Sequence, residues 1–157
     1  MASRSTVKGR SFWGPPYWEL IHSIAYHYTP DKKDYFIRFL VLLTLTLPCM
    51  MCRKNLVTKL KAHSPLKYTS SSENLFYYTY IIHDLANKHI SKYHPPTPKK
   101  SPSFVSIKKT YSSKTLQEID NIIWHVIHIF AATLKYEHGE YLRAFVQIVS
   151  RLVPHTR

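Results

Sequence analysis

Residues 13–28 read WGPPYWELIHSIAYHY and carry the strongest structural pattern in the chain. Four residues follow the i, i+3, i+4, i+7 spacing of one helix face: Trp18, Ile21, His22 and Ala25. Pro15 and Pro16 come just before this face. Proline suits the first turn of a helix, because the N–H that it lacks would have no partner there. The pattern therefore predicts a helix over residues 16–28.

The rest of the sequence predicts further helices and no strand. The expected helices cover residues 35–47, 48–62, 75–92, 116–136 and 140–152. No segment alternates apolar and polar residues with the period of a strand, so the class is all-α. Residues 93–114 are rich in Pro, Ser and Lys, which is typical of a solvated linker but also suits an ordered basic flap over a bound anion.

Composition limits the classes to which the protein can belong. The chain has 157 residues, of which 45% are hydrophobic and 3 are Gly, and its formal net charge is +13. This indicates one basic domain and excludes collagen-like or disordered acidic chains. The longest apolar stretch, residues 39–47, is shorter than the roughly 20 residues that span a bilayer, so no membrane association is expected. The basic N-terminus has no secretory h-region and only faintly resembles a transit peptide.

An internal repeat is visible at a fixed offset of 106 residues. Between residues 18–48 and 124–154, seven identical pairs occur without a gap: Trp18/Trp124, Ile21/Ile127, His22/His128, Ala25/Ala131, Tyr35/Tyr141, Phe39/Phe145 and Pro48/Pro154. Either the segment is a decayed duplication or two amphipathic hairpins share apolar spacing. Residues 114–157 are too apolar to stay solvated, so this hairpin should pack on the rest of the chain or on another subunit.

Cys49 and Cys52 form a CxxC pair at the expected start of the third helix. The positive end of a helix stabilises a thiolate, which suits a pair that exchanges disulfides. Half of a zinc site and two inert buried cysteines are the alternatives, although no second ligand pair follows at zinc spacing, so no metal site is expected. A helical protein that oxidises thiols needs an electron acceptor, and a flavin is the natural carrier.

Three ordered blocks make the chain resemble the ERV/ALR family of FAD-dependent sulfhydryl oxidases, especially its small viral members. These blocks are WGPPYWELIHSIAYHY, LPCMMCRKN and HDLANKHISK, and SFVSIKKTY is similar to the segment that follows them in the family. The resemblance implies a four-helix bundle that holds FAD, with a short flap and an additional C-terminal helical hairpin. Together with the internal repeat, the resemblance divides the chain into a basic tail at 1–12, an oxidase domain at 13–113 and a structural, degenerate repeat of residues 18–48 at 114–157.

The resemblance also implies roles for individual residues. Cys49 would meet the substrate thiol and Cys52 would lie against the flavin. The residues expected to bind FAD are Trp13, Trp18, His22, Tyr28, His83, Asn87, Lys92, Phe104 and Lys108. Asp84 departs from the pattern, because the family usually has Asn there.

We therefore expect a thiol oxidase that passes electrons from the cysteine pair through FAD to oxygen and produces hydrogen peroxide. Its expected partners are a protein dithiol or a small thioredoxin-like substrate, molecular oxygen, and a second copy in a homodimer. The expected location is the host cytoplasm and the virion, with the mitochondrial intermembrane space as the alternative. The rival functions are a flavin-free disulfide carrier and a basic nucleic-acid-binding or virion structural protein, for which charge alone is a weak argument.

Overall fold

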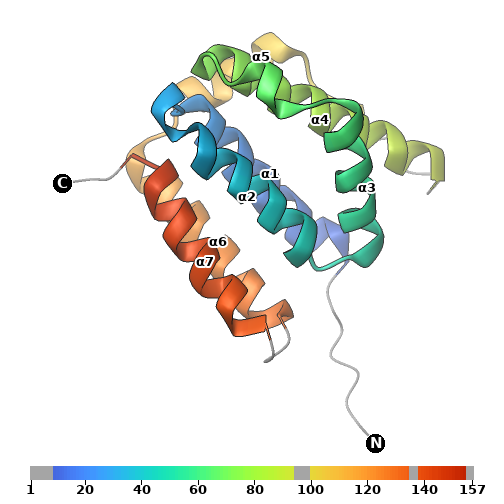
Figure 1. The fold of residues 1–157 in the computed structure, drawn as a ribbon. Coiled ribbons are helices and arrows are strands. Elements are labelled where there is room, and N and C mark those ends of the chain that lie inside the picture. Colours follow the sequence, from blue (N-terminus) through green and yellow to red (C-terminus); the bar gives the residue numbers. More distant parts are fainter. Residues whose placement is uncertain (1–8, 94–99, 135–137, 155–157) are drawn as a thin grey trace, which may run out of the picture.

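The computed structural model describes residues 9–93, 100–134 and 138–154 (Figure 1). These residues form helices and no strand, which confirms the all-α prediction. The α-helices are α1 Arg10–Tyr26, α2 Lys33–Thr46, α3 Met50–Ala62, α4 Ser72–Tyr93, α5 Phe104–Ser112, α6 Leu116–Thr133 and α7 Gly139–Leu152, with short 3-10 turns η1 Pro30–Lys32 and η2 Pro65–Tyr68. No helix in these ranges has both the length and the apolar character needed to cross a membrane.

Helix α1 lies at the centre of the bundle. It packs along α4 on one side and along α6 on the other, while α2 packs along α7 and meets α3 at its end (Figure 1). The C-terminal hairpin of α6 and α7 thus lies against the α1–α2 hairpin of the same chain, so the apolar side chains that face this hairpin are covered in cis.

The start of α1 differs from the prediction. The helix begins at Arg10 and not at Pro16, so part of the segment assigned to a basic tail is helical and both prolines lie inside the helix. Pro15 and Pro16 cannot donate to the carbonyls of Ser11 and Phe12. Ser11 and Phe12 are both exposed, and α1 continues through the two prolines.

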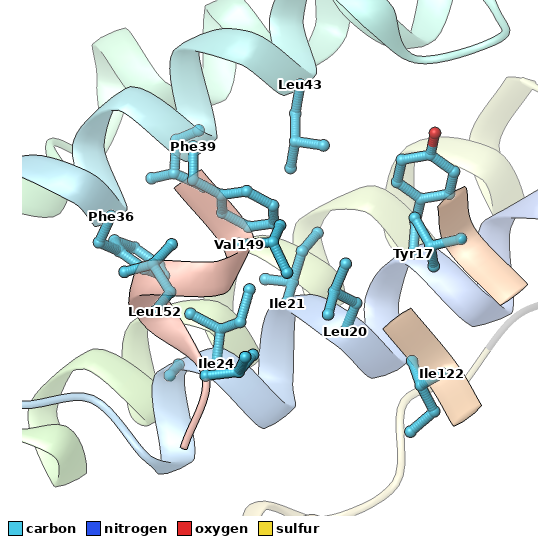
Figure 2. Packing of buried hydrophobic residues seen from close by; sticks show 14 of the residues in the cluster. Tyr17, Leu20, Ile21, Ile24, Phe36, Phe39, Leu43, Ile122, Val149 and Leu152 are labelled. Carbon is cyan, nitrogen blue, oxygen red and sulfur yellow. The ribbon is translucent and has the colours of Figure 1, made fainter. Parts of the chain in front are cut away.

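Buried residues from both hairpins meet in a common core (Figure 2). Phe39 of α2 and Phe145 of α7 are both fully buried, and their ring centroids lie 6.1 Å apart. These two residues are counterparts at the 106-residue offset. In α1 and α6, Leu20 and Ile24 are buried, and so are their counterparts Val126 and Phe130. The two hairpins therefore bury the same face of their repeat pattern.

Part of the basic segment after α4 is an ordered helix. Ser103 caps α5 by accepting a hydrogen bond from the backbone N–H of Ser106, at 3.2 Å. Tyr111 of α5 is buried and packs beside His22 and Phe76. Residues 104–112 are therefore part of the fold, whereas residues 94–99 lie outside the described ranges.

Candidate active site

Cys49 and Cys52 are joined by a disulfide at the start of α3. Cys49 is the residue that caps the helix, and its Sγ accepts a hydrogen bond from the backbone N–H of Cys52 at 3.2 Å. Both cysteines are partly buried. After reduction, the unpaired N–H groups and the positive end of the helix dipole would favour a thiolate here. The local structure therefore suits thiol–disulfide exchange.

A cavity of about 390 Å³ lies beside the disulfide, between α1, α3 and α4. This volume is in the range of small-molecule binding sites. Cys52 is part of its wall, whereas Cys49 is not among the lining residues. The two cysteines thus differ in position, because Cys52 lines the cavity and Cys49 caps the helix.

An aromatic and histidine cluster forms the wall opposite α3. Trp18 of α1 stacks on His83 of α4, with ring centroids 4.1 Å apart and an interplanar angle of 5°. His22 lies behind this pair and its Nε2 is 2.9 Å from Nδ1 of His83. Three residues predicted to share a site are therefore in contact, although His22 itself does not line the cavity.

The hydrogen bonds of this cluster fix which ring nitrogens carry protons. The Thr79 hydroxyl donates to the carbonyl of Phe76 at 2.8 Å, so its oxygen accepts from Nδ1 of His22, also at 2.8 Å. In neutral His22 the Nε2 atom must then accept from Nδ1–H of His83. Thr79, which the sequence analysis did not single out, thus orients both histidines.

His22 is held in its neutral form. Burial, with the charge of nearby His83 as the second cause, lowers the pKa of His22 from its ordinary value of 6.5 to about 3. A protonated His22 would also lose one of its two hydrogen bonds, because it would have no lone pair left to accept one. His22 is therefore neutral at ordinary pH.

Polar groups at the cavity can contact a ligand that has hydrogen-bonding edges. Asn87 is buried and donates to the Ser101 hydroxyl at 3.0 Å. Asn55 of α3 donates to Nε2 of His89 of α4, also at 3.0 Å, which links the two walls. The hydroxyl of Tyr17 is buried and has no hydrogen-bond partner among the described residues. An unsatisfied buried hydroxyl is costly, so a ligand that supplies a partner would be favoured there.

Four other predicted cofactor residues lie outside the cavity lining. The Tyr28 hydroxyl donates to the carbonyl of Thr69 at 2.9 Å. Lys92 lies over the ring of Tyr93, with its Nζ 5.2 Å from the centroid. Phe104 packs against aromatic rings of α4, and Lys108 forms an ion pair with Glu73. Each side chain is used in a contact between or within structural elements.

Comparison with known proteins places this site in a family. The model of the Erv1/Alr family matches residues 15–111. The chain belongs to the Erv1/Alr family. It is also 29% identical, over 112 residues, to the FAD-linked sulfhydryl oxidase of African swine fever virus, a match that covers 69% of this chain and 87% of that protein. No solved structure gives a significant match.

The Erv1/Alr match covers the cysteine pair and most of the cavity wall, and it ends before α6 and α7. Asp84, which departs from the family pattern, lies outside the cavity lining and forms an ion pair with Lys88 at 2.7 Å. The hydrogen bond from Lys88 lowers the pKa of Asp84. This carboxylate is therefore part of the surface of α4.

The sequence analysis missed several lining residues that helical spacing could have found. On α3 the lining residues continue from Cys52 at i+3, i+4, i+7 and i+8: Asn55, Leu56, Lys59 and Leu60. On α4 they flank His83 at i−4, i+3 and i+7: Thr79, Ala86 and Ile90, beside the predicted Asn87 at i+4. Both sets are single helix faces, so a helical projection through Cys52 and His83 indicates them. Within the described ranges, no cluster of His, Cys, Asp or Glu could hold a metal ion.

Proposed function

We propose that this protein is an FAD-linked sulfhydryl oxidase that forms disulfide bonds in protein substrates. The observation that carries the proposal is the position of the Cys49–Cys52 disulfide, with Cys52 in the wall of an aromatic cavity. Membership of the Erv1/Alr family and similarity to a viral FAD-linked sulfhydryl oxidase support this activity.

The cavity has the chemistry that FAD requires. A flavin or an adenine needs flat stacking partners, and Trp13, Trp18 and His83 supply aromatic rings at the cavity wall. The ribose and ring edges need hydrogen-bonding groups, for which Tyr17, Asn55 and Asn87 are available types. Lys59, on the same wall as Cys52, supplies a cation for the phosphates. The residues present therefore fit the cofactor.

The cysteine pair performs the exchange with substrate. A substrate thiolate attacks Sγ of Cys49 to form a mixed disulfide, and Cys52 leaves as a thiolate. The second substrate thiolate then attacks the substrate sulfur of the mixed disulfide, which releases the oxidised substrate and the Cys49 thiolate. Bound FAD would pass this electron pair to oxygen, so that two thiols and O₂ give one disulfide and H₂O₂.

The partners follow from this chemistry. The substrate is a protein dithiol or a small thioredoxin-like protein, because the accessible sulfur exchanges with thiols and needs no other substrate group. We further propose that the protein acts in the host cytoplasm and is packaged in the virion. Catalytic cysteines, unlike structural disulfides, also suit a reducing compartment.

The visible spectrum of the purified protein tests the proposal. We expect a yellow protein with one flavin per chain that consumes oxygen when a dithiol is added. The matched control is Cys52→Ser, which should retain flavin and lose oxygen consumption. A folded, colourless protein that still exchanges disulfides and cannot be reconstituted with FAD would instead show a flavin-free disulfide carrier.

A further inference from the structure

The outward side of α6 carries a stripe of side chains, most of which are exposed. We define the α6 stripe as Asp120, Trp124, Ile127, His128 and Ala131. Trp124 is 59% exposed, and His128 and Ala131 are exposed as well. Trp124 and His128 nevertheless lie close together, with ring centroids 6.3 Å apart and an interplanar angle of 35°. Their counterparts Trp18 and His22 have almost the same arrangement, at 5.9 Å and 30°, under α4.

The internal repeat is best preserved on this exposed stripe. Four of the seven identical pairs of the repeat fall there: Trp124, Ile127, His128 and Ala131 match Trp18, Ile21, His22 and Ala25. The buried counterparts in α1 and α6 have diverged, since Leu20 corresponds to Val126 and Ile24 to Phe130. A solvated helix face does not need Trp, and an exposed aromatic surface of this kind is typical of an interface.

Charge indicates which partner suits the stripe. The chain has a net charge of +13, so two copies repel each other over most of their surfaces. Among the described helices, α6 alone contains neither Lys nor Arg, and it carries Glu118 and Asp120. It is therefore the helix along which a second copy can approach with the least repulsion.

The α1–α2 face is not available to a second copy, because α6 and α7 already cover it in cis. The stripe, in contrast, is self-complementary. If two α6 helices cross antiparallel at Trp124, Asp120 of each copy faces His128 of the other, and Gln117 faces Ala131. Such a pairing is isologous, as a twofold dimer requires.

We propose that a second copy of this chain docks on the α6 stripe, with the two Trp124 side chains at the twofold axis and Asp120 opposite His128. This inference rests on the exposure, charge and spacing of the α6 stripe, and it does not depend on the oxidase activity. The stripe is separate from the cavity lining, so dimerisation and cofactor binding can be tested separately.

Sedimentation velocity of the full chain over a concentration series tests the proposal. The wild type should dimerise, and Trp124→Lys should weaken the dimer roughly thirtyfold or more, because central Trp residues dominate such interfaces. The control is Val146→Lys, which makes the same change at an exposed apolar residue of α7 and should leave the dimer intact. Circular dichroism and flavin content should be unchanged in both variants.

A charge swap tests the antiparallel pairing itself. Asp120→Lys should weaken the dimer, and adding His128→Glu in the same chain should restore it, because the two positions face each other across copies. A wild-type chain that remains monomeric over the whole series would overturn the proposal, and the stripe would then await a different protein. A dimer that resists Trp124→Lys, or that the paired swap fails to restore, would overturn it as well.

Discussion

Helices α1 and α6 carry the same Trp, Ile, His and Ala residues at the same spacing, yet only one of the two sets lies beside the site. In α1, Trp18 stacks on His83 and His22 bonds to Thr79, and both partners come from α4. In α6, Trp124 and His128 face outward. The residue pattern therefore does not make the site by itself, because the covering helix supplies the second wall and the hydrogen-bond partners.

The two copies also differ at their ends. The first copy runs through Pro48 into Cys49 and the rest of the CxxC pair, whereas the sequence has His155 at the position that corresponds to Cys49. The two repeat segments share a core through residues such as Phe39 and Phe145, but only the first is followed by a cysteine pair. We propose that residues 124–154 stabilise residues 18–48 of the same chain and bind no flavin of their own.

The largest effect should come from the cysteines that only the first copy has. Cys49→Ser and Cys52→Ser should each lower dithiol-dependent oxygen consumption by on the order of a thousandfold or more, because neither variant can hold a disulfide. Flavin should stay at one per chain. Only Cys49→Ser keeps the thiol in the cavity wall, so only this variant should show new long-wavelength absorption. Identical spectra for the two variants would contradict the assigned roles.

The next largest effect should come from the counterpart pair Phe39 and Phe145 in the shared core. Either residue changed to Ala should lower the free energy of unfolding by about 3–5 kcal/mol, because a large buried ring is lost. Since the rings are in contact, the double variant should lose less than the sum. Urea unfolding measures all three values, with exposed Val146→Ala as the control, expected within about 0.5 kcal/mol of wild type. If Phe145→Ala left the free energy of unfolding unchanged, the α6–α7 hairpin would not be needed for the stability of the fold.

Apolar spacing, together with the prolines on either side of α3, was sufficient to predict where α2, α3, α6 and α7 lie. It could not predict which stripe is covered, since Trp18 and Trp124 have the same local sequence pattern and differ only in a contact with α4. The predicted start of α1 was wrong. Proline favours the first turn of a helix, but this preference does not exclude prolines further inside, and Pro15 and Pro16 lie inside α1.

The cysteines and the Trp18–His83 contact were predicted from motifs, whereas Tyr28 and Phe104 lie elsewhere. Both are aromatic residues near a motif, and aromatic residues are also the usual choice for a core. Tyr28 has a backbone carbonyl partner at Thr69, and Phe104 has three rings of α4. Only the packing of α5 and η2 decides these positions, and packing between distant segments is not visible in local sequence.

A smaller effect should distinguish the two counterpart histidines. His22→Ala should lower stability by about 2–4 kcal/mol and weaken flavin retention, because it removes both hydrogen bonds of a buried side chain. His128→Ala should change the stability of the monomer by less than about 0.5 kcal/mol. Denaturant unfolding and the ratio of flavin to protein measure both variants. If the two substitutions had equal effects, the difference between the copies would not lie in their environment.

The same pair predicts a difference in pH dependence. In the folded protein the pKa of His22 is lowered from 6.5 to about 3, so the unfolded chain takes up this proton first as the pH falls. The stability due to neutral His22 is therefore complete above pH 6.5 and is lost progressively between pH 6.5 and about 3, by at most about 1.4 kcal/mol per pH unit. His22→Ala should remove this part of the slope, and His128→Ala should keep it.

The smallest effect should appear at Tyr17, whose counterpart in the second copy is Ile123. Tyr17 lines the cavity, and its buried hydroxyl has no partner among the described residues. Burial also raises the pKa of this phenol, so the group remains a neutral donor. Tyr17→Phe should stabilise the flavin-free protein by up to about 1 kcal/mol, because an unsatisfied hydroxyl is removed, and should weaken flavin binding by a similar amount. Thermal unfolding of the flavin-free protein and titration with FAD measure the two changes, which should have opposite signs. A substitution that destabilises the flavin-free protein would show that the hydroxyl already has a partner there, and unchanged FAD affinity would show that the cofactor does not use it.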